Sequence, residues 1–222
     1  GWDKDTHVFQ NEVTDSTVWE LHVKDFSYDA SSGVSEENRG KYLAFTENGT
    51  TLNGEGNIST CIDYLKELGV NTVQLNPFYD YASVNEAGND EQFNWGYDPQ
   101  NYNVPEGSYY NHTYSTDSCF QKTVPNYYYR LNRRCKFSDG SGCGNECATE
   151  RAMYRNYVIQ SCLYWVNEYH IDGFRYDLMG IMDVETMNQI RDALDQVDNR
   201  VTMWGEAWTG GDSYHPTNTC DG

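Results

Sequence analysis

Two carboxylates in this sequence each follow a short apolar run, and together they suit acid–base chemistry on a sugar. Asp177 closes the segment 170–177, which reads His-Ile-Asp-Gly-Phe-Arg-Tyr-Asp, and Glu206 follows the apolar run Val201–Trp204. If both runs are buried strands of a (β/α) barrel, the two acids lie at the rim where catalytic side chains project. Such a pair can cleave a glycosidic bond, with one acid attacking the anomeric carbon and the other protonating the leaving oxygen.

A simpler explanation is that both acids only cap strands, and for either motif alone the two explanations carry about equal weight. Between the motifs lies the segment 184–197, in which apolar residues recur every three or four positions. The strand–helix–strand order therefore favours catalysis over capping.

Length and charge narrow the possible functions. The chain has 222 residues and a net charge of −19, so it can hold one large domain or two small ones. The acidic balance, with an isoelectric point near 4.4, argues against nucleic acid as a partner, because phosphates require a basic surface. No apolar run approaches the roughly 20 residues that span a membrane. The sequence begins at Gly1 with neither Met nor a signal-peptide pattern, so localisation stays open.

The seven cysteines are an odd number, so they cannot all pair within one chain. Cys135, Cys143 and Cys147 crowd a glycine-containing loop, but a zinc site would need a fourth ligand and closer pairs. We expect no metal and no cofactor. Sequons at Asn48 and Asn57, and a third at Asn111, match a pattern that is common by chance.

Periodicity predicts an α/β fold with a parallel sheet. Strands are expected at 17–23 and 70–75, with a helix over 58–68 whose apolar face carries Ile58, Ile62, Leu65 and Leu68. A second set follows, with helices at 150–169 and 184–197 and strands at 171–175 and 201–204. This order indicates βαβ units.

The stretch from 77 to 149 does not fit this pattern. It shows neither a convincing amphipathic helix nor a buried strand. Connections without secondary structure rarely exceed roughly 12–15 residues in compact domains. The stretch is therefore expected to be a large functional loop, or a region from which part of a barrel is missing.

With these motifs in view, the sequence resembles the α-amylase superfamily, and within it the type I pullulanases, over nearly its whole length. The segment 93–99, Phe-Asn-Trp-Gly-Tyr-Asp-Pro, is similar to their Tyr-Asn-Trp-Gly-Tyr-Asp-Pro signature and differs only at Phe93. The segment 172–177 resembles the nucleophile motif, and 205–208 resembles the acid/base motif with Ala207 where Gly is common.

The sequence departs from the family pattern in two places. Of the motif Asp-x-x-x-Asn-His on the third barrel strand only Asn111 and His112 remain, with Gly107 at the Asp position. Tyr109 abuts Tyr110, as if about one βα unit had been removed. The family's His-Asp motif would lie beyond Gly222. The expectation is a single catalytic domain over 1–222, a partial (β/α)8 TIM barrel with strands 1, 2, 4 and 5 and without strand 3 or strands 6–8.

The resemblance implies hydrolysis of α-1,6 branch linkages in pullulan, amylopectin or glycogen-type α-glucans by a retaining double displacement. Asp177 would be the nucleophile, supported by Arg175, and Glu206 the acid/base. A dry aromatic surround, including Trp208, would raise the pKa of Glu206.

Substrate-binding residues also follow from the resemblance. Tyr97 would stack on the sugar that bears the scissile bond, and Trp208 would add an aromatic contact. His112, next to Asn111, would bind a hydroxyl of the same sugar. Ordinary rim packing explains Tyr97 and Trp208 about as well if the resemblance is set aside.

Because the third strand and the last aspartate are missing from the pattern, turnover is expected to be impaired. Two alternatives remain open, namely a catalytically dead α-glucan-binding remnant and a fragment with no function of its own.

Overall fold

The computed structural model describes residues 4–6, 8–81, 83–86, 88, 91–109, 124, 127–134, 136–143 and 146–213. The chain forms two compact units. Gln10–Ser118 make up the N-terminal unit, and Gly1–Phe9 together with Cys119–Gly222 make up the C-terminal unit.

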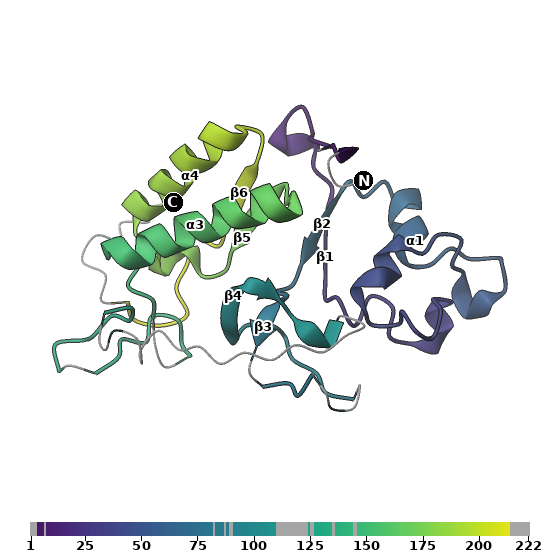
Figure 1. Cartoon of the computed structure of the whole chain (residues 1–222), viewed down its shortest axis with the longest axis horizontal. Coiled ribbons are helices and arrows are strands. Elements are labelled where there is room, and N and C mark those ends of the chain that lie inside the picture. The colour runs from purple at the N-terminus through teal and green to yellow at the C-terminus, as the bar shows by residue number, and fades with distance from the viewer. Residues whose placement is uncertain are drawn as a thin grey trace. The chain divides into compact units, whose positions relative to one another are not determined.

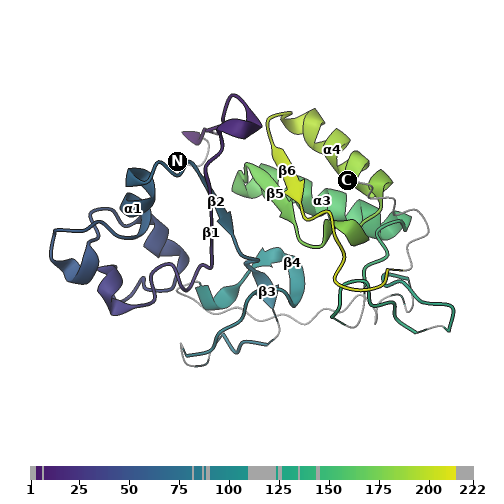
Figure 2. The same ribbon diagram turned by 180° about the vertical axis from the view of Figure 1, so that it is seen from behind.

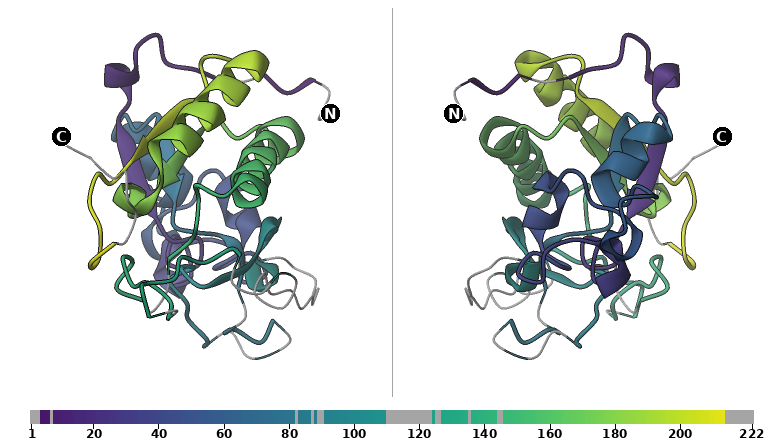
Figure 3. Two further views of the ribbon diagram at one scale, coloured as in Figure 1. Left: turned by 90° about the vertical axis from the view of Figure 1, so that its left-hand side faces the viewer. Right: turned by 90° about the vertical axis from the view of Figure 1, so that its right-hand side faces the viewer.

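The C-terminal unit alternates helix and strand. Its elements are α3 (Ala152–Tyr169), β5 (Gly173–Tyr176), α4 (Val184–Val197) and β6 (Thr202–Gly205), with a 3-10 helix, η7, at Met179–Ile181. β5 and β6 pair in parallel, with Gly173 opposite Thr202 and Tyr176 opposite Gly205. The two helices lie side by side on one face of this strand pair (Figures 1 and 2). Figure 3 shows α3 and α4 from two further sides.

The core of the C-terminal unit lies between these helices and strands. Its buried members are Cys162 and Val166 of α3, Ile190 and Leu194 of α4, and Val201. The apolar positions of α4 recur at three- and four-residue intervals, which places them on one face of the helix. The predicted helices and strands of this half of the sequence are therefore confirmed.

A side-chain cap marks the start of α4, and a left-handed residue marks the end of α3. Asp183 caps α4, since its carboxylate accepts the Thr186 N–H at 3.0 Å. Arg155 of α3 joins this cap, donating to Asp183 at 3.0 Å and to the Thr186 hydroxyl at 2.7 Å. α3 ends where His170 adopts a left-handed conformation, with φ at 53°. These contacts hold α3 and α4 together beside the strands.

The N-terminal unit contains the other predicted βαβ motif. β1 (Val18–Leu21) and β2 (Thr72–Leu75) pair in parallel, and α1 (Cys61–Glu67) connects them. The helix is shorter than expected, because it starts at Cys61. Leu65 is buried, but Ile58 precedes the helix and is exposed, as is Leu68. The four-residue apolar face of the prediction is therefore wrong at both ends.

The stretch from 77 to 149 contains two strands that the sequence did not indicate. β3 (Tyr79–Tyr81) and β4 (Pro99–Pro105) form an antiparallel pair with shifts in register. The expectation of no buried strand is wrong here, because Asp80 and Tyr81 are buried. β3 has only three residues, and β4 shows no alternation of buried and exposed positions. A period of two cannot be recognised under those conditions.

Short 3-10 helices fill much of the remaining N-terminal unit. They lie at Val13–Asp15, Ala30–Ser32, Tyr42–Thr46, Leu52–Gly54 and Gly107–Tyr109.

The described residues form a mixed α/β structure with three two-stranded sheets and no closed barrel. Strands 1, 2, 4 and 5 of the expectation correspond to β1, β2, β5 and β6. The Tyr109–Tyr110 junction lies at the edge of the described residues, because 110–123 are outside them. In the part of the chain that the structure describes, no helix is both long and apolar enough to cross a membrane.

We expect Ile190→Ala to lower the free energy of unfolding by about 2–5 kcal/mol, because Ile190 has no exposed surface and truncation leaves a cavity. Val197→Ala on the same helix is the control, since Val197 is 45% exposed. Urea denaturation followed by tryptophan fluorescence measures both. Equal losses in the two variants would mean that α4 does not pack through Ile190.

Candidate active site

The pairing of β5 with β6 brings the two predicted catalytic acids together. Asp177 directly follows Tyr176 and Glu206 directly follows Gly205, and these two preceding residues are opposite each other in the ladder. The ladder continues one step further, since the Glu206 N–H donates to the Tyr176 carbonyl at 3.1 Å. Residues at matching positions of neighbouring strands project to the same face. The register alone therefore places both carboxylates on one side of the strand pair.

Arg175 lies between the two acids. It is two residues before Asp177, so both side chains project to the same face of the extended chain at the end of β5. Its guanidinium donates from Nη1 to Asp177 Oδ1 at 2.5 Å and from Nη2 to Glu206 Oε1 at 2.6 Å. One cation thus compensates two neighbouring anions, whose mutual repulsion would otherwise disfavour the arrangement.

Backbone groups of Leu178 and of η7, which follows it, hold Glu206 from its other side. The Leu178 N–H donates to Glu206 Oε2 at 3.1 Å. The Gly180 N–H donates to the Glu206 carbonyl at 3.1 Å. Side chain and main chain of Glu206 are therefore both attached to the turn that follows β5.

These contacts lower the pKa of Glu206 below its ordinary value. The hydrogen bond from the Leu178 N–H contributes most, and the charge of Arg175 and a hydrogen bond from the Trp208 side chain act in the same direction. Burial, the second-largest contribution, opposes the effect, but the donors together outweigh it. The expectation that an aromatic surround raises the pKa is wrong for this state, because 30% of the Glu206 side chain is exposed and donors surround it.

The turn after Asp177 has an unfavourable backbone conformation. Leu178 adopts a left-handed conformation, with φ at 47°, which costs a β-carbon-bearing residue about 1–2 kcal/mol. This conformation directs the Leu178 N–H toward Glu206. Gly180 follows with close contact to Trp208, since a β-carbon there would lie 2.5 Å from the Trp208 carbonyl oxygen. Backbone strain of this kind clusters at functional sites.

Trp208 lies close to the paired acids and is open to solvent. It is 58% exposed and donates a hydrogen bond that lowers the pKa of Glu206. An exposed indole beside a carboxylate offers a stacking surface, as the resemblance implied for this residue.

Tyr97, the other predicted aromatic contact, belongs to the N-terminal unit and is 47% exposed. Internal hydrogen bonds shape its segment, 93–99. Asn94 accepts the Gly96 N–H at 2.6 Å and donates to Asp98 at 2.8 Å. The Asn94 carbonyl in turn accepts from His22 at 2.8 Å.

His22 is buried and joins this segment to the core of the N-terminal unit. Its Nε2 also lies 2.9 Å from the Tyr109 hydroxyl, which accepts from the Tyr81 hydroxyl at 2.8 Å. The ring packs against Phe93, with 4.7 Å between the ring centroids. Burial raises the pKa of Tyr81 to about 12, so its hydroxyl stays protonated and can donate.

A cavity of about 30 Å³ lies beside this network, lined in part by His22, Lys24, Lys41 and Glu86. That volume holds about one or two water molecules. It is too small to enclose a sugar ring.

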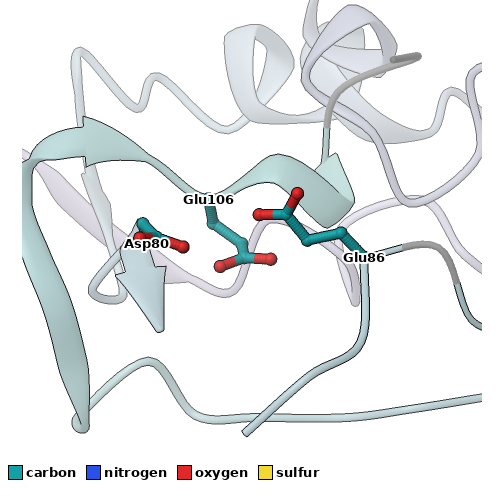
Figure 4. Close-up of side chains that lie close together, drawn as sticks. All are labelled: Asp80, Glu86 and Glu106. Atoms are coloured by element: carbon teal, nitrogen blue, oxygen red, sulfur yellow. The ribbon is translucent and has the colours of Figure 1, made fainter. Parts of the chain in front are cut away.

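Three acids of the N-terminal unit, Asp80, Glu86 and Glu106, converge closely enough to hold a metal ion (Figure 4). Their nearest oxygen atoms lie within 4.8 Å of one another. Glu106 is fully buried and accepts the N–H groups of Tyr81 at 3.1 Å and Ser108 at 2.9 Å. Burial raises the pKa of Glu106. These bonds indicate a structural carboxyl that fixes the β3–β4 pair.

The cysteines of the described residues show no zinc site. Cys61, Cys143, Cys147 and Cys162 are free thiols, and the described residues contain no metal-binding group that includes a cysteine. Cys135 lies outside the described residues.

The structure thus brings Asp177, Arg175, Glu206 and Trp208 together in the C-terminal unit. Asn111 and His112 lie outside the described residues, so their predicted roles stay predictions. Sequence reasoning missed the Leu178 and Gly180 N–H groups. Every residue except proline carries a backbone N–H, so the residue type does not indicate which one binds a catalytic side chain.

Comparison with known proteins gives one consistent result. The chain is 35% identical to a pullulanase of Bacillus subtilis over 93% of its length, and 29% identical to chloroplastic pullulanase 1 of Arabidopsis thaliana over 96%. The structure of a pullulanase from Bacillus acidopullulyticus matches 97% of the chain at 42% identity, with a TM-score of 0.88. No protein-family model matches.

The chain is pullulanase-like. A pullulanase from Paenibacillus barengoltzii in complex with maltohexaose and α-cyclodextrin also matches 96% of it, with a TM-score of 0.86 and 42% identity. The chain spans about a third of the length of these relatives, 33% of the Bacillus subtilis protein and 30% of the Bacillus acidopullulyticus chain.

In the pullulanase-like chain we expect Gly96→Ala to destabilise the N-terminal unit. Gly96 has φ at 90°, and a β-carbon there would overlap the Pro77 carbonyl oxygen. Gly54→Ala is the control, because Gly54 also has positive φ, at 70°, but no atom within 4 Å of the added carbon. Gly54→Ala should cost about 1 kcal/mol from backbone strain alone, and Gly96→Ala clearly more in the same denaturation experiment. Equal costs would show that the approach to Pro77 is not close.

The lowered pKa of Glu206 predicts how stability depends on pH. A carboxyl with a lower pKa in the folded than in the unfolded state contributes stability above its unfolded pKa, and this contribution is lost as the pH falls through the folded value. We expect Glu206→Gln to be less stable than the parent at neutral pH and the difference to shrink in acid. Urea denaturation across pH measures it. Glu185→Gln is the control, because it changes the net charge by the same amount. If its stability difference from the parent also shrank in acid, Glu206 would have no specific role.

Proposed function

We propose that the chain carries the catalytic pair of a debranching glycoside hydrolase that acts on α-1,6 linkages of α-glucans by a retaining double displacement. The observation that carries the proposal is the Arg175 guanidinium between Asp177 and Glu206. In retaining enzymes the two carboxyl groups are about 5 Å apart, against about 6.5–9.5 Å in inverting ones. Two carboxylates that share one guanidinium fit the shorter separation.

Asp177 is the proposed nucleophile. Arg175 occupies its Oδ1, so Oδ2 is the oxygen that would attack C1 of the sugar. A charge-assisted hydrogen bond keeps a carboxylate ionised, which a nucleophile requires. The bond from C1 to the bridging oxygen breaks as the bond to Asp177 forms, and the retained configuration follows from a second displacement by water.

Glu206 is the proposed acid/base. It would protonate the departing oxygen in the first step and remove a proton from water in the second. Without ligand its pKa is lowered, which suits the second step better than the first. A bound glucan that excludes water from Glu206 would raise its pKa and prepare it as an acid.

The aromatic contacts are proposed for Trp208 and Tyr97, and the hydroxyl contact for His112 beside Asn111. Of these contacts, that of Trp208 is the best supported, because its side chain donates a hydrogen bond to Glu206. Solved pullulanases with maltohexaose and α-cyclodextrin, or with maltotetraose, resemble the chain, which supports α-glucan as the ligand class. We further propose that the paired strands are parts of a (β/α)8 barrel in a single catalytic domain.

A second candidate function is binding of α-glucan without turnover. The lowered pKa of Glu206 favours it, because an ionised carboxyl is a poor proton donor. Exposed aromatic rings such as Trp95 and Trp208 suit binding in either case. Affinity electrophoresis in pullulan combined with a reducing-sugar assay on the 222-residue chain separates the two. Retardation with released sugar indicates an enzyme, and retardation alone indicates a binding protein. The impairment of turnover stays a prediction that this assay measures.

Where the chain or a protein containing it hydrolyses pullulan, we expect Asp177→Asn to lower kcat by about 10⁴-fold or more, the scale for loss of a nucleophile, with binding retained. Glu206→Gln should spare substrates with good leaving groups, because these need no proton. Asp192→Asn, at an exposed position of α4, is the matched control. Activity of Asp177→Asn above a few per cent of the parent would refute the assignment.

A further inference from the structure

The described residues of the segment 127–150, here named the anchor loop, include a buried ion pair. Arg130 is 4% exposed, and the Glu146 side chain is fully buried. Arg130 donates from Nη1 to Glu146 at 3.1 Å, from Nε to Glu150 at 3.0 Å and from Nη2 to the Thr149 hydroxyl at 3.1 Å. Glu146 Oε2 also accepts the Gly140 N–H at 2.6 Å. The Arg130–Glu146 pair therefore connects several parts of the anchor loop to one another.

Burying such a pair is costly, because both ions lose their hydration. A well-packed apolar pair could stabilise the loop as effectively, so stability alone explains the pair poorly. The remaining contact of Arg130 suggests another role. Its Nη1 also donates to the Ile181 carbonyl at 2.6 Å, outside the anchor loop.

Ile181 is the last residue of η7, the 3-10 helix that holds Glu206. The Leu178 N–H of the same turn binds Glu206 Oε2, and the Gly180 N–H binds the Glu206 carbonyl. Leu178 has a left-handed conformation that it would not adopt without support from its surroundings. The bond from Arg130 thus reaches the turn at the end opposite Leu178 and provides such support.

The anchor loop also contacts the chain that follows β6. The Gly211 N–H donates to the Gly140 carbonyl at 3.0 Å, and the Ser213 hydroxyl donates to Glu146 at 3.2 Å. Two segments outside β5 supply hydrogen bonds to the Glu206 side chain. They are the turn that runs from Leu178 into η7, and the chain after β6, which carries Trp208. Both are therefore connected to the Arg130–Glu146 pair.

We propose that Arg130 is a positioning residue for Glu206, acting through the Ile181 carbonyl and η7. It contacts neither the acid nor the sugar site. The inference deepens the proposed function, because it rests on Glu206 as the acid/base. The charged groups that face Glu206 in the described residues are Arg175 of β5 and, across that guanidinium, Asp177. The residues of η7 offer only N–H groups, and Trp208 offers its indole.

The pKa of Glu206 gives a readout that a merely structural role would not change. If η7 moves when Arg130 is replaced, the Leu178 N–H leaves Glu206 Oε2 and the pKa of Glu206 rises toward its ordinary value. If Arg130 only stabilises the anchor loop, the free energy of unfolding falls while the pKa stays the same. A ¹³C NMR titration of labelled glutamate carboxyls in the full chain measures the pKa, and Glu206→Gln identifies the resonance.

The first variant is the double substitution Arg130→Met with Glu146→Gln, which removes the bond to Ile181 without leaving an unpaired buried charge. Arg130→Lys keeps the charge but loses the planar fork of donors, so it should give a partial effect. Arg191→Met is the matched control. Arg191 donates to the Val201 carbonyl, also at 2.6 Å, at the far end of β6.

We expect the pKa of Glu206 to rise most in the double variant, less in Arg130→Lys and not at all in Arg191→Met. An unchanged pKa in a folded double variant would overturn the proposal, as would an equal rise in Arg191→Met. The titration needs no turnover, so its result can be interpreted whether or not the chain hydrolyses pullulan. A reducing-sugar assay that shows no hydrolysis would count against the proposed function and leave the positioning result intact.

Discussion

The candidate active site depends on one guanidinium shared by two carboxylates. Without Arg175, the register of β5 and β6 would bring Asp177 and Glu206 together as uncompensated anions, and one of them would take up a proton. With Arg175 in place, both can stay charged side by side. The register is in turn fixed by the main-chain ladder and by Gly173, where a β-carbon would overlap the Thr202 hydroxyl. The chemistry of the site therefore begins with the close packing of two short strands.

Different neighbours give Glu206 and Asp177 different surroundings. The Glu206 side chain accepts the Leu178 N–H at the start of the turn, whereas Asp177 accepts a hydrogen bond from Arg175. Two like residues with unlike environments are the usual arrangement where a reaction needs one nucleophile and one proton carrier. In this chain the difference comes from the main chain of the turn, not from an aromatic enclosure.

The sequence predicted the elements that have a regular pattern. The βαβ order, the two long helices and the proximity of Asp177 and Glu206 follow from apolar periodicity and from the position of the acids after strands. β3 and β4 were not predicted, because β3 is too short and β4 too polar to show a hydrophobic period. The role of Arg130 was not predicted either, since its contacts with Glu146 and Ile181 depend on the path of an irregular loop. Neither spacing nor residue type encodes such a path.

The N-terminal unit shows how a short motif can be held by distant residues. His22, just past β1, binds the main chain at Asn94 within the segment that carries Tyr97. The motif therefore depends on a histidine outside it, and a motif search would give no reason to inspect that residue.

The thiols of the C-terminal unit have very different access to solvent. Cys162 is buried next to the Tyr176 hydroxyl, and burial raises its pKa to about 11, whereas Cys143 of the anchor loop is exposed. Thiolate is the reactive form, so of these two an alkylating probe at neutral pH should modify Cys143. A fluorophore attached there would sit on the anchor loop itself and make any movement of that loop optically visible.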